Sequence, residues 1–274
     1  MIGKVMTFNL RYNEPKDGDN AWPYRVKRVS QTIQEHAPIL FGTQEGYYDM
    51  LKELHEELPA YNWIGTGRFG EHEDEHNAIF YKKDQLEIVE EGHFWLSDTP
   101  EVVATKSWDS MYPRMCTWAR FIDKNSQRVF VVYNTHLDHR SQEAREHGVK
   151  VIWNYIAKHQ IDQPLPVILM GDMNSHPNNA TIRYLSGESK EEGPKGWLMD
   201  AYSLLEGEIG RTAHDFNGGS DEAPIDYIFV SPEVELLETI IDRRQIGGGY
   251  PSDHYPIIAA VRLTLNGANQ GDKR

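Results

Sequence analysis

Polar side chains that can bind a metal ion or activate water recur where strand-like apolar runs begin or end. The positions, each with its neighbouring run, are Asn9 (VMTF), Glu45 (ILFGTQ), His136 (VVYNT), Asp172 and Asn174 (PVILMG), Asp226 (DYIFV) and Asp253-His254 (YPIIAAV). A single polar residue at a strand end is ordinary, because strands end in polar turns. The recurrence of carboxylate, amide and imidazole groups at so many strand ends indicates a site.

Asp172 and Asn174 have the spacing of one face of an extended segment. Residues two apart in extended backbone point to the same side, so a carboxylate and an amide can address one small object. The carboxylate can deprotonate water, and the amide can hold that water or a phosphate oxygen. The alternative is an Asx-turn after the strand, followed by ordinary loop.

Asp253 and His254 are adjacent, and on a strand they would face opposite ways. One could then reach a metal ion and the other a substrate oxygen. Because the pair enters an apolar strand, a buried His254 imidazole needs a partner, and Asp226 is a candidate to orient it.

The segment His72-Glu73-Asp74-Glu75-His76 matches the pattern H-E-x-x-H, which on a helix places two histidines on one face for zinc. A zinc-peptidase helix needs an apolar face for packing. The surrounding FGEHEDEHN has none and runs directly into the strand-like AIFYKK. The sequence therefore predicts an acidic loop that enters a strand, and a zinc peptidase is the least favoured function.

The elements that position these residues follow from apolar periodicity. Strands are predicted at 4–10, 39–45, 77–83, 86–96, 115–122, 128–137, 166–174, 225–231 and 256–265. Amphipathic helices are predicted at 24–37, 49–58 and 141–160. Strands are consecutive in mid-chain and alternate with helices near the ends, which suggests two packed sheets with helices outside, in one α/β domain.

Composition limits the function classes. The 274 residues include 28 Lys and Arg against 42 Asp and Glu, a formal net charge of −14, so the surface repels nucleic acid and anionic membrane at long range. A phosphate substrate would need local positive charge from a few Arg and Lys or from a bound cation. The single cysteine, Cys116, permits no intrachain disulfide and is expected to be inert core. The first residues are strand-like, and no apolar run approaches a membrane span, so we expect a cytoplasmic protein without membrane insertion.

Six ordered motifs resemble the endonuclease/exonuclease/phosphatase superfamily, which includes DNase I, exonuclease III, CCR4-type deadenylases, inositol polyphosphate 5-phosphatases and neutral sphingomyelinases. They are MTFNLRYN, GTQEG, YNTHLDH, GDMNSHP, IDYIFVS and PSDHYPI, and the match extends from residue 5 to about residue 262. NAWPYR and PRMCTWARF are similar to a bacterial branch. The resemblance implies a four-layer α/β/β/α sandwich with two packed, mostly antiparallel sheets. We expect one domain over 1–265 and a polar tail over 266–274.

The resemblance also implies a divalent cation, Mg²⁺ or Mn²⁺. Carboxylate and amide oxygens without cysteine suit such hard cations. Glu45 is the implied main ligand, with Asn9 and Asp253 near the ion. The ion would supply the positive field that the acidic surface lacks.

The catalytic roles come from the same resemblance. Asp172 would orient and deprotonate the attacking water with Asn174 beside it, and His136 and His254 would donate to phosphate oxygens. Asp226 would hold His254 and fix its tautomer.

The family alignment places Glu75 where it would orient His136. Arg114 is a candidate contact for the substrate phosphate, with a surface arginine or a salt bridge as the alternative. Arg25 is expected to be structural, and Trp118 to be core. Trp22, Trp95 and Trp108 are open between core and a cleft wall that stacks on bases or sugars.

The expected function is metal-dependent hydrolysis of phosphate esters, with cleavage of a phosphodiester by a nuclease or phosphodiesterase as the leading form. The alternative is a phosphatase or phosphodiesterase of small or lipid-derived substrates such as inositol phosphates or sphingomyelin-like head groups. A non-catalytic binding protein on this fold is the remote alternative. The substrate partner is thus a phosphate ester, with nucleic acid among the options, and the sequence indicates no particular protein partner.

Overall fold

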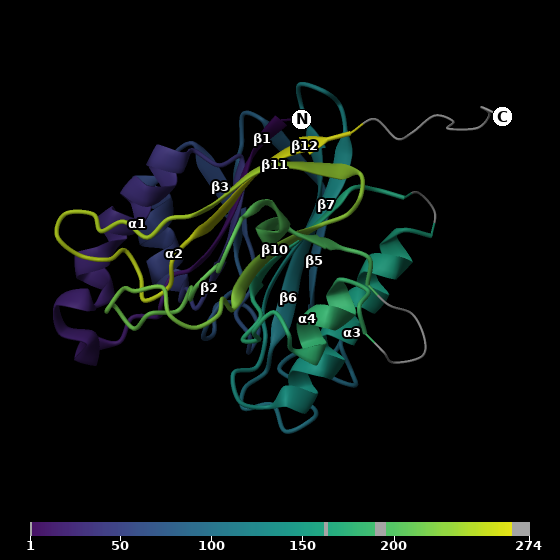
Figure 1. Cartoon of the computed structure of the whole chain (residues 1–274), viewed down its shortest axis with the longest axis horizontal. Coiled ribbons are helices and arrows are strands. Elements are labelled where there is room, and N and C mark those ends of the chain that lie inside the picture. The colour runs from purple at the N-terminus through teal and green to yellow at the C-terminus, as the bar shows by residue number, and fades with distance from the viewer. Residues whose placement is uncertain (1, 162–163, 190–195, 265–274) are drawn as a thin grey trace.

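The structure is a computed structural model that describes residues 2–161, 164–189 and 196–264. The tail predicted at 266–274 lies outside these residues. Two six-stranded sheets carry the fold, and a helical layer covers the outer face of each sheet (Figure 1). The predicted four-layer arrangement is therefore confirmed.

The first sheet has the strand order β11-β12-β1-β2-β4-β3. Its strands, in that order, are Val234–Ile241, Ile257–Leu263, Ile2–Asn9, Leu40–Gln44, Ile79–Lys82 and Tyr61–Ile64. Only β1 and β2 run parallel, and the other neighbours are antiparallel.

The second sheet has the order β5-β6-β7-β8-β10-β9. Its strands, in that order, are Leu86–Trp95, Met115–Asp123, Val129–His136, Val167–Asp172, Asp226–Val230 and Met199–Asp200. Here β7 and β8 form the one parallel pair. Both sheets are thus mostly antiparallel, as predicted.

Helices α1 (Trp22–His36) and α2 (Tyr48–Glu57) cover the first sheet, and α3 (Gln142–His159) and α4 (Ala180–Leu185) cover the second (Figure 1). Helix α1 buries Val29 and Ile33 on one stripe against the first sheet, as its periodicity predicted. Two short 3₁₀ helices, Pro15–Asn20 and Ala201–Leu204, complete the described elements.

A polar bridge joins the two sheets directly beneath the strand ends. Asn134 of β7 accepts a hydrogen bond from Gln44 at 2.7 Å and donates to the carbonyls of Thr43 and Ala78 at 2.9 Å. Gly42 makes this crossing possible, because a Cβ there would lie 2.6 Å from the Asn134 side chain. The buried amide is thus fully paired and fixes the sheets relative to each other.

The two parallel pairs explain how the polar residues meet. Asn9 ends β1 and His136 and Asp172 end β7 and β8, so their side chains reach the same edge of the sandwich. Strand β10 runs the opposite way and begins at that edge with Asp226, which lies directly opposite Asp172. The edge is therefore the point where carboxylates, an amide and an imidazole converge.

Local structure differs from the prediction in a few places. Strands β3, β9 and β11 and helix α4 were not predicted, and β11 is an edge strand with acidic side chains on its exposed face. Asp253 and His254 precede the last strand: Asp253 lies in a bend, His254 forms an isolated bridge with Ala213, and β12 begins only at Ile257. Pro251 and Pro256 flank the bend, and neither can donate a backbone hydrogen bond to a ladder.

Candidate active site

A cleft of about 440 Å³ opens at the convergence of the strand ends. Its walls include most of the predicted site residues, namely Glu45, Glu75, Arg114, His136, Asp172, Asn174 and His254. Asn9 and Asp226 lie buried beside these residues and contact them directly. The sequence indicated that these polar strand-end residues meet at one site, and the structure brings them together at this cleft.

Asn9 connects the two carboxylates of the cleft. Its side-chain Nδ2 donates to Glu45 Oε1 at 3.0 Å and to Asp172 Oδ2 at 3.1 Å. Its Oδ1 accepts the backbone N–H of Arg11 at 3.0 Å. Glu45 adopts a left-handed backbone with φ 63°, and its second oxygen accepts the N–H of Tyr12 at 3.2 Å. One amide therefore holds two acidic groups in a fixed relation.

His254 and Asp226 form a close ion pair beside the cleft, with 2.8 Å between Nδ1 and Oδ2. Both are almost fully buried, and Asp226 accepts from the ring, which leaves Nε2 to carry the other proton. His136, at the end of β7, has its Nε2 3.5 Å from Asp172 Oδ2. The two imidazoles thus both lie close to Asp172, His136 from a strand end and His254 from the segment before β12.

Burial and charge set the protonation of these groups. Burial and the neighbouring Asp226 raise the pKa of Asp172 to about 7. Burial alone would lower the pKa of His254, but the Asp226 carboxylate overrides it and holds that pKa well above its usual range. Burial, followed by the nearby Arg114 cation, lowers the pKa of His136. One imidazole is thus set up as a cation and the other as a neutral group.

Asn174 reaches the cleft through a turn and not through the extended backbone considered from its spacing. Its φ is 44°, its N–H donates to Asp172 Oδ1 at 2.9 Å, and its side-chain Nδ2 donates to the carbonyl of Leu137 at 3.0 Å. This is the Asx-turn alternative, with the amide still lining the cleft. The side-chain oxygen is the part of Asn174 available to an incoming water.

Glu75 lies at the far end of the cleft among cations. Its Oε2 is 3.0 Å from Arg68 Nη1, 3.9 Å from Arg114 Nη1 and 3.9 Å from His136 Nδ1. The approach to His136 is too long for a hydrogen bond, so Glu75 faces that imidazole without pairing with it as Asp226 pairs with His254. Burial and the Glu45 charge raise the pKa of Glu75 to about 7.

Arg114 is a buried cleft residue and not a surface arginine. Its Nη2 lies 3.0 Å from His139 Nδ1, and its Nε lies 3.6 Å from Asp138. Arg68 and Arg114 both lie over the ring of Tyr112. Nε of each arginine is buried without a hydrogen-bond acceptor among the described residues. Two cations with spare donors therefore sit next to the histidines.

Asp253 lies outside the walls of the cleft. Its carboxylate is 3.7 Å from Arg11 Nε and accepts from Ser252 Oγ at 3.3 Å. It reaches the site through Arg11, a residue that lines the cleft. Its predicted position near a metal ion remains a prediction.

The residues that the sequence interpretation missed are Arg11, Tyr12, Tyr47, Arg68, Asp74, Tyr112 and His139. Arg11, Tyr12 and His139 fall inside the motifs NLRYN and THLDH, so their position beside predicted site residues was a usable signal. Arg68, Asp74 and Tyr112 lie in irregular loops, where no spacing rule indicates what faces the cleft.

The H-E-x-x-H segment is a loop, as predicted. His72 stacks on Tyr48 with 3.7 Å between ring centroids, and neither it nor His76 belongs to a cluster of metal-binding groups in the described part of the chain.

Cys116 is fully buried, and burial raises the pKa of its thiol. Among the described residues that line the cleft there is no tryptophan, since Trp22 and Trp95 are core residues and Trp108 packs on His147.

The donor set suits a hard divalent cation. Glu45, His136 and Asp172 form one group whose ligand atoms lie within 4.8 Å of one another, and Asp172, Asp226 and His254 form a second. Two buried carboxylates with raised pKa values, Asp172 and Glu75, and the adjacent Glu45 concentrate negative charge that a cation would compensate. No helix among the described residues is long and apolar enough to cross a membrane.

Comparison with known proteins gives the family and the fold. The model of the "Endonuclease/Exonuclease/phosphatase family" matches residues 6–254. No protein with a curated functional description matches this chain. An endonuclease/exonuclease/phosphatase from Bacteroides vulgatus is 32% identical, with 96% of this chain and 99% of that chain covered and a TM-score of 0.87.

Two further structures widen the comparison. A mannosyl-6-phosphatase from Bacteroides thetaiotaomicron is 32% identical, with 94% of this chain and 99% of that chain covered and a TM-score of 0.86. The catalytic domain of human Nocturnin, with a bound sulfate, is 20% identical over 96% of this chain and 94% of that one, with a TM-score of 0.74. The human protein shares the fold.

Proposed function

Because the chain belongs to the endonuclease/exonuclease/phosphatase family, we propose that it hydrolyses phosphate esters with the help of a divalent cation, Mg²⁺ or Mn²⁺. The observation that carries the proposal is the convergence of Glu45, Asn9 and Asp172 with the Asp226–His254 pair at one cleft. Glu45 would hold the cation, with Asn9 fixing its carboxylate. When bound, the cation neutralises charge that develops on the phosphoryl oxygens.

Asp172 would orient and deprotonate the attacking water. A carboxylate with a pKa near neutrality is a useful general base at neutral pH, and Asn9 and the Asn174 backbone hold its two oxygens in place. The side-chain oxygen of Asn174 can accept a hydrogen bond from the same water. Asp253 would act from outside the cleft by fixing Arg11.

His254 and His136 would donate to the phosphate oxygens. His254 is held as a cation by Asp226, so it can stabilise negative charge or give a proton to the leaving oxygen. Arg114 and Arg68 line the same cleft and add guanidinium donors beside the histidines.

We further propose that the substrate is a small phosphate ester, with a sugar phosphate as the first candidate. The cleft volume of about 440 Å³ suits a small molecule, and the net charge of −14 disfavours a long polyanion. The mannosyl-6-phosphatase at 32% identity supports a phosphorylated sugar. Nuclease activity, the leading form in the sequence interpretation, becomes the second candidate.

The test is a substrate panel with purified protein in Mg²⁺, Mn²⁺ or EDTA. The panel contains mannose 6-phosphate, glucose 6-phosphate, inositol phosphates, sphingomyelin, bis-p-nitrophenyl phosphate, single- and double-stranded DNA, RNA and poly(A). We expect metal-dependent release of phosphate from the sugar phosphates and strong loss of turnover in Asp172→Ala and His254→Ala. Turnover that is independent of metal, or unchanged in both variants, would contradict the mechanism. Faster cleavage of a nucleic acid than of the sugar phosphates would contradict the proposed substrate class.

A further inference from the structure

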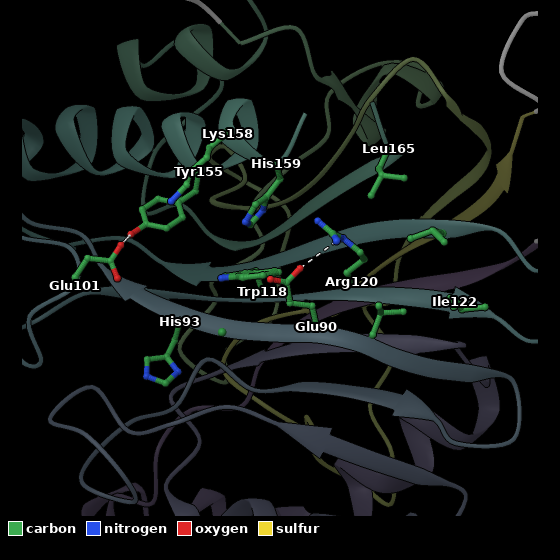
Figure 2. A pocket seen from close by; sticks show the side chains of 13 residues that line it. Glu90, His93, Glu101, Trp118, Arg120, Ile122, Tyr155, Lys158, His159 and Leu165 are labelled. Atoms are coloured by element: carbon green, nitrogen blue, oxygen red, sulfur yellow. Dashed lines mark hydrogen bonds and ion pairs between the residues drawn. The ribbon is translucent and has the colours of Figure 1, made fainter. Parts of the chain in front are cut away.

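A second depression, of about 760 Å³, lies on the outer face of the second sheet beside the C-terminal end of α3. Figure 2 shows Lys158 and His159 on one side of it and Trp118, Glu90 and Arg120 on the strands that form its floor. It shares no lining residue with the catalytic cleft. The proposed catalytic chemistry uses none of its side chains, so any ligand of this depression would bind apart from the catalytic cleft.

Trp118 is held in the floor by its neighbours on both sides. It lies opposite Gly92 in the β5–β6 ladder, and a Cβ on Gly92 would come within 2.9 Å of the indole Nε1. His159 packs against the indole with 4.2 Å between centroids, and its Nδ1 pairs with Tyr133 at 2.6 Å. The absence of a side chain at Gly92 therefore leaves the indole Nε1 edge uncovered in the lining of the depression.

The floor of the depression carries both hydrogen-bond donors and acceptors. Arg120 Nη1 lies 3.1 Å from Glu90 Oε2, while Arg120 Nε is buried without an acceptor in the described part of the chain. A bulge in β5 between Ile88 and Glu90 changes the register at this point, and bulges re-aim side chains at binding sites. A carboxylate and a guanidinium side by side can bind the two hydroxyls of a diol, one accepting and one donating.

Charge in the depression is balanced. Glu90 pairs with Arg120, while Glu101 accepts from the Tyr155 hydroxyl and Lys158 adds a second cation to the lining. Burial lowers the pKa of His93 and of His159, so both imidazoles are neutral at pH 7. The balance favours an uncharged ligand over a phosphate or a nucleotide. Stacking of a base on Trp118 is also disfavoured, because His159 already covers that ring.

We propose that this depression binds a neutral pyranose sugar. A sugar needs both donors and acceptors for its hydroxyls and apolar surface for its C–H faces, and Val89, Tyr155 and Leu165 supply the latter. The volume lies in the range of about 300–1,000 Å³ that is usual for small-molecule sites. The inference does not rest on the proposed phosphatase activity, because it uses none of the residues of the catalytic cleft.

Saturation-transfer NMR with the full chain tests the proposal. The probes are the methyl pyranosides of mannose, glucose and galactose, with AMP as an anionic aromatic comparison. We expect at least one pyranoside to bind and AMP not to bind. Glu90→Gln should weaken binding about tenfold, the effect of losing a hydrogen bond to a charged group. Gly92→Ala should also weaken it, because the new methyl group displaces the indole.

Two control variants locate the bound sugar. Glu87→Gln changes an exposed carboxylate of the same strand that does not line the depression, and it should leave binding unchanged. Asp172→Ala should also leave binding unchanged, because the catalytic cleft is separate. The proposal is overturned if no pyranoside binds, if Glu90→Gln binds as tightly as the native chain, if Asp172→Ala abolishes binding, or if AMP binds in a Glu90-dependent way.

Discussion

The His254 ring donates from Nδ1 to the Asp226 carboxylate across 2.8 Å, and His36 pairs with Asp242 across the same 2.8 Å on a different part of the molecule. The two pairs have matching chemistry, but only the first borders the cleft. The carboxylate in each case fixes which ring nitrogen carries a proton. The second pair is therefore a natural control for the first.

Asp226→Asn should lower kcat by about a hundredfold or more, in the range of general acid–base and electrostatic contributions. The amide keeps the shape of the side chain but removes the charge that holds His254 as a cation. Steady-state kinetics on the preferred phosphate ester measure the effect. Asp242→Asn should leave kcat within about twofold, as expected for a site distant from the chemistry. Equal losses in the two variants would contradict the role given to Asp226.

Glu75→Ala should lower the rate less than His136→Ala does. His136 lies in the cleft beside Asp172, so its removal should cost about 10²–10⁴ in kcat. Glu75 reaches His136 only at 3.9 Å and binds Arg68 more closely, so it acts through its neighbours. Steady-state kinetics of Glu75→Gln, measured beside Glu75→Ala, separate the effect of losing the charge from the effect of losing the packed side chain. If Glu75→Ala had the activity of the native chain, Glu75 would have no role in the site.

The sequence was sufficient for the parts of the fold that periodicity governs. Strands such as β7 and β8 are continuous apolar runs, and a polar residue ending such a run lies at the sheet edge whatever the loops do. Periodicity does not give strand direction, so the prediction that His136 and Asp172 meet rested on the recurrence of polar residues at strand ends and on the family resemblance. Strand β11 was missed because it is an edge strand whose acidic face reads as loop, and a bulge between Leu236 and Glu238 breaks its alternation.

The rest of the site depends on loop backbone that no periodicity describes. Arg68 meets Glu75 because the loop between them folds back on itself, with Gly67 packed so tightly that a Cβ would lie 2.1 Å from the Glu73 carbonyl. Asp74 in that loop has φ 70°, a conformation that spacing arguments do not anticipate. Asn174 was misjudged in the same way, since its left-handed turn replaced an extended geometry.

Addition of Mg²⁺ or Mn²⁺ should raise the thermal midpoint of the native chain, and EDTA should abolish turnover. A ligand that binds only the folded state stabilises it by about 2.7 kcal/mol at a hundredfold excess over Kd. Glu45→Gln should lose most of the shift, because it removes the main proposed ligand. Calorimetric melts of each protein with and without the ion measure the shift in the thermal midpoint. His72→Ala should behave as the native chain, and loss of the shift in that variant would instead locate the cation in the H-E-x-x-H loop.

Arg25→Met should destabilise the fold by about 3 kcal/mol, since buried hydrogen bonds to a charged group contribute about 1.5–3 kcal/mol each and are not additive. The fully buried guanidinium donates to the carbonyls of Leu10, Pro251, Arg11 and Asn20 and so connects the loops beside Asn9 and Asp253. Urea denaturation gives the change in free energy of unfolding. Lys27→Met, on the exposed face of the same helix, should stay within about 0.5 kcal/mol. Similar stability of the two variants would contradict the structural role of Arg25.

Asp242→Asn should destabilise the chain by about 1–2 kcal/mol at pH 7, and the difference should shrink in acid. Burial opposes ionisation of Asp242, but hydrogen bonds from Arg244 and His36 override it and hold its pKa well below the usual range. A carboxylate whose pKa is depressed in the folded state stabilises that state above its unfolded pKa of about 3.9. The stabilisation is lost as pH falls from there through the folded pKa. Urea denaturation of both proteins at pH 7 and near pH 3 measures the gap, and a gap of the same size at both pH values would show that the stabilisation does not come from the ionised carboxylate.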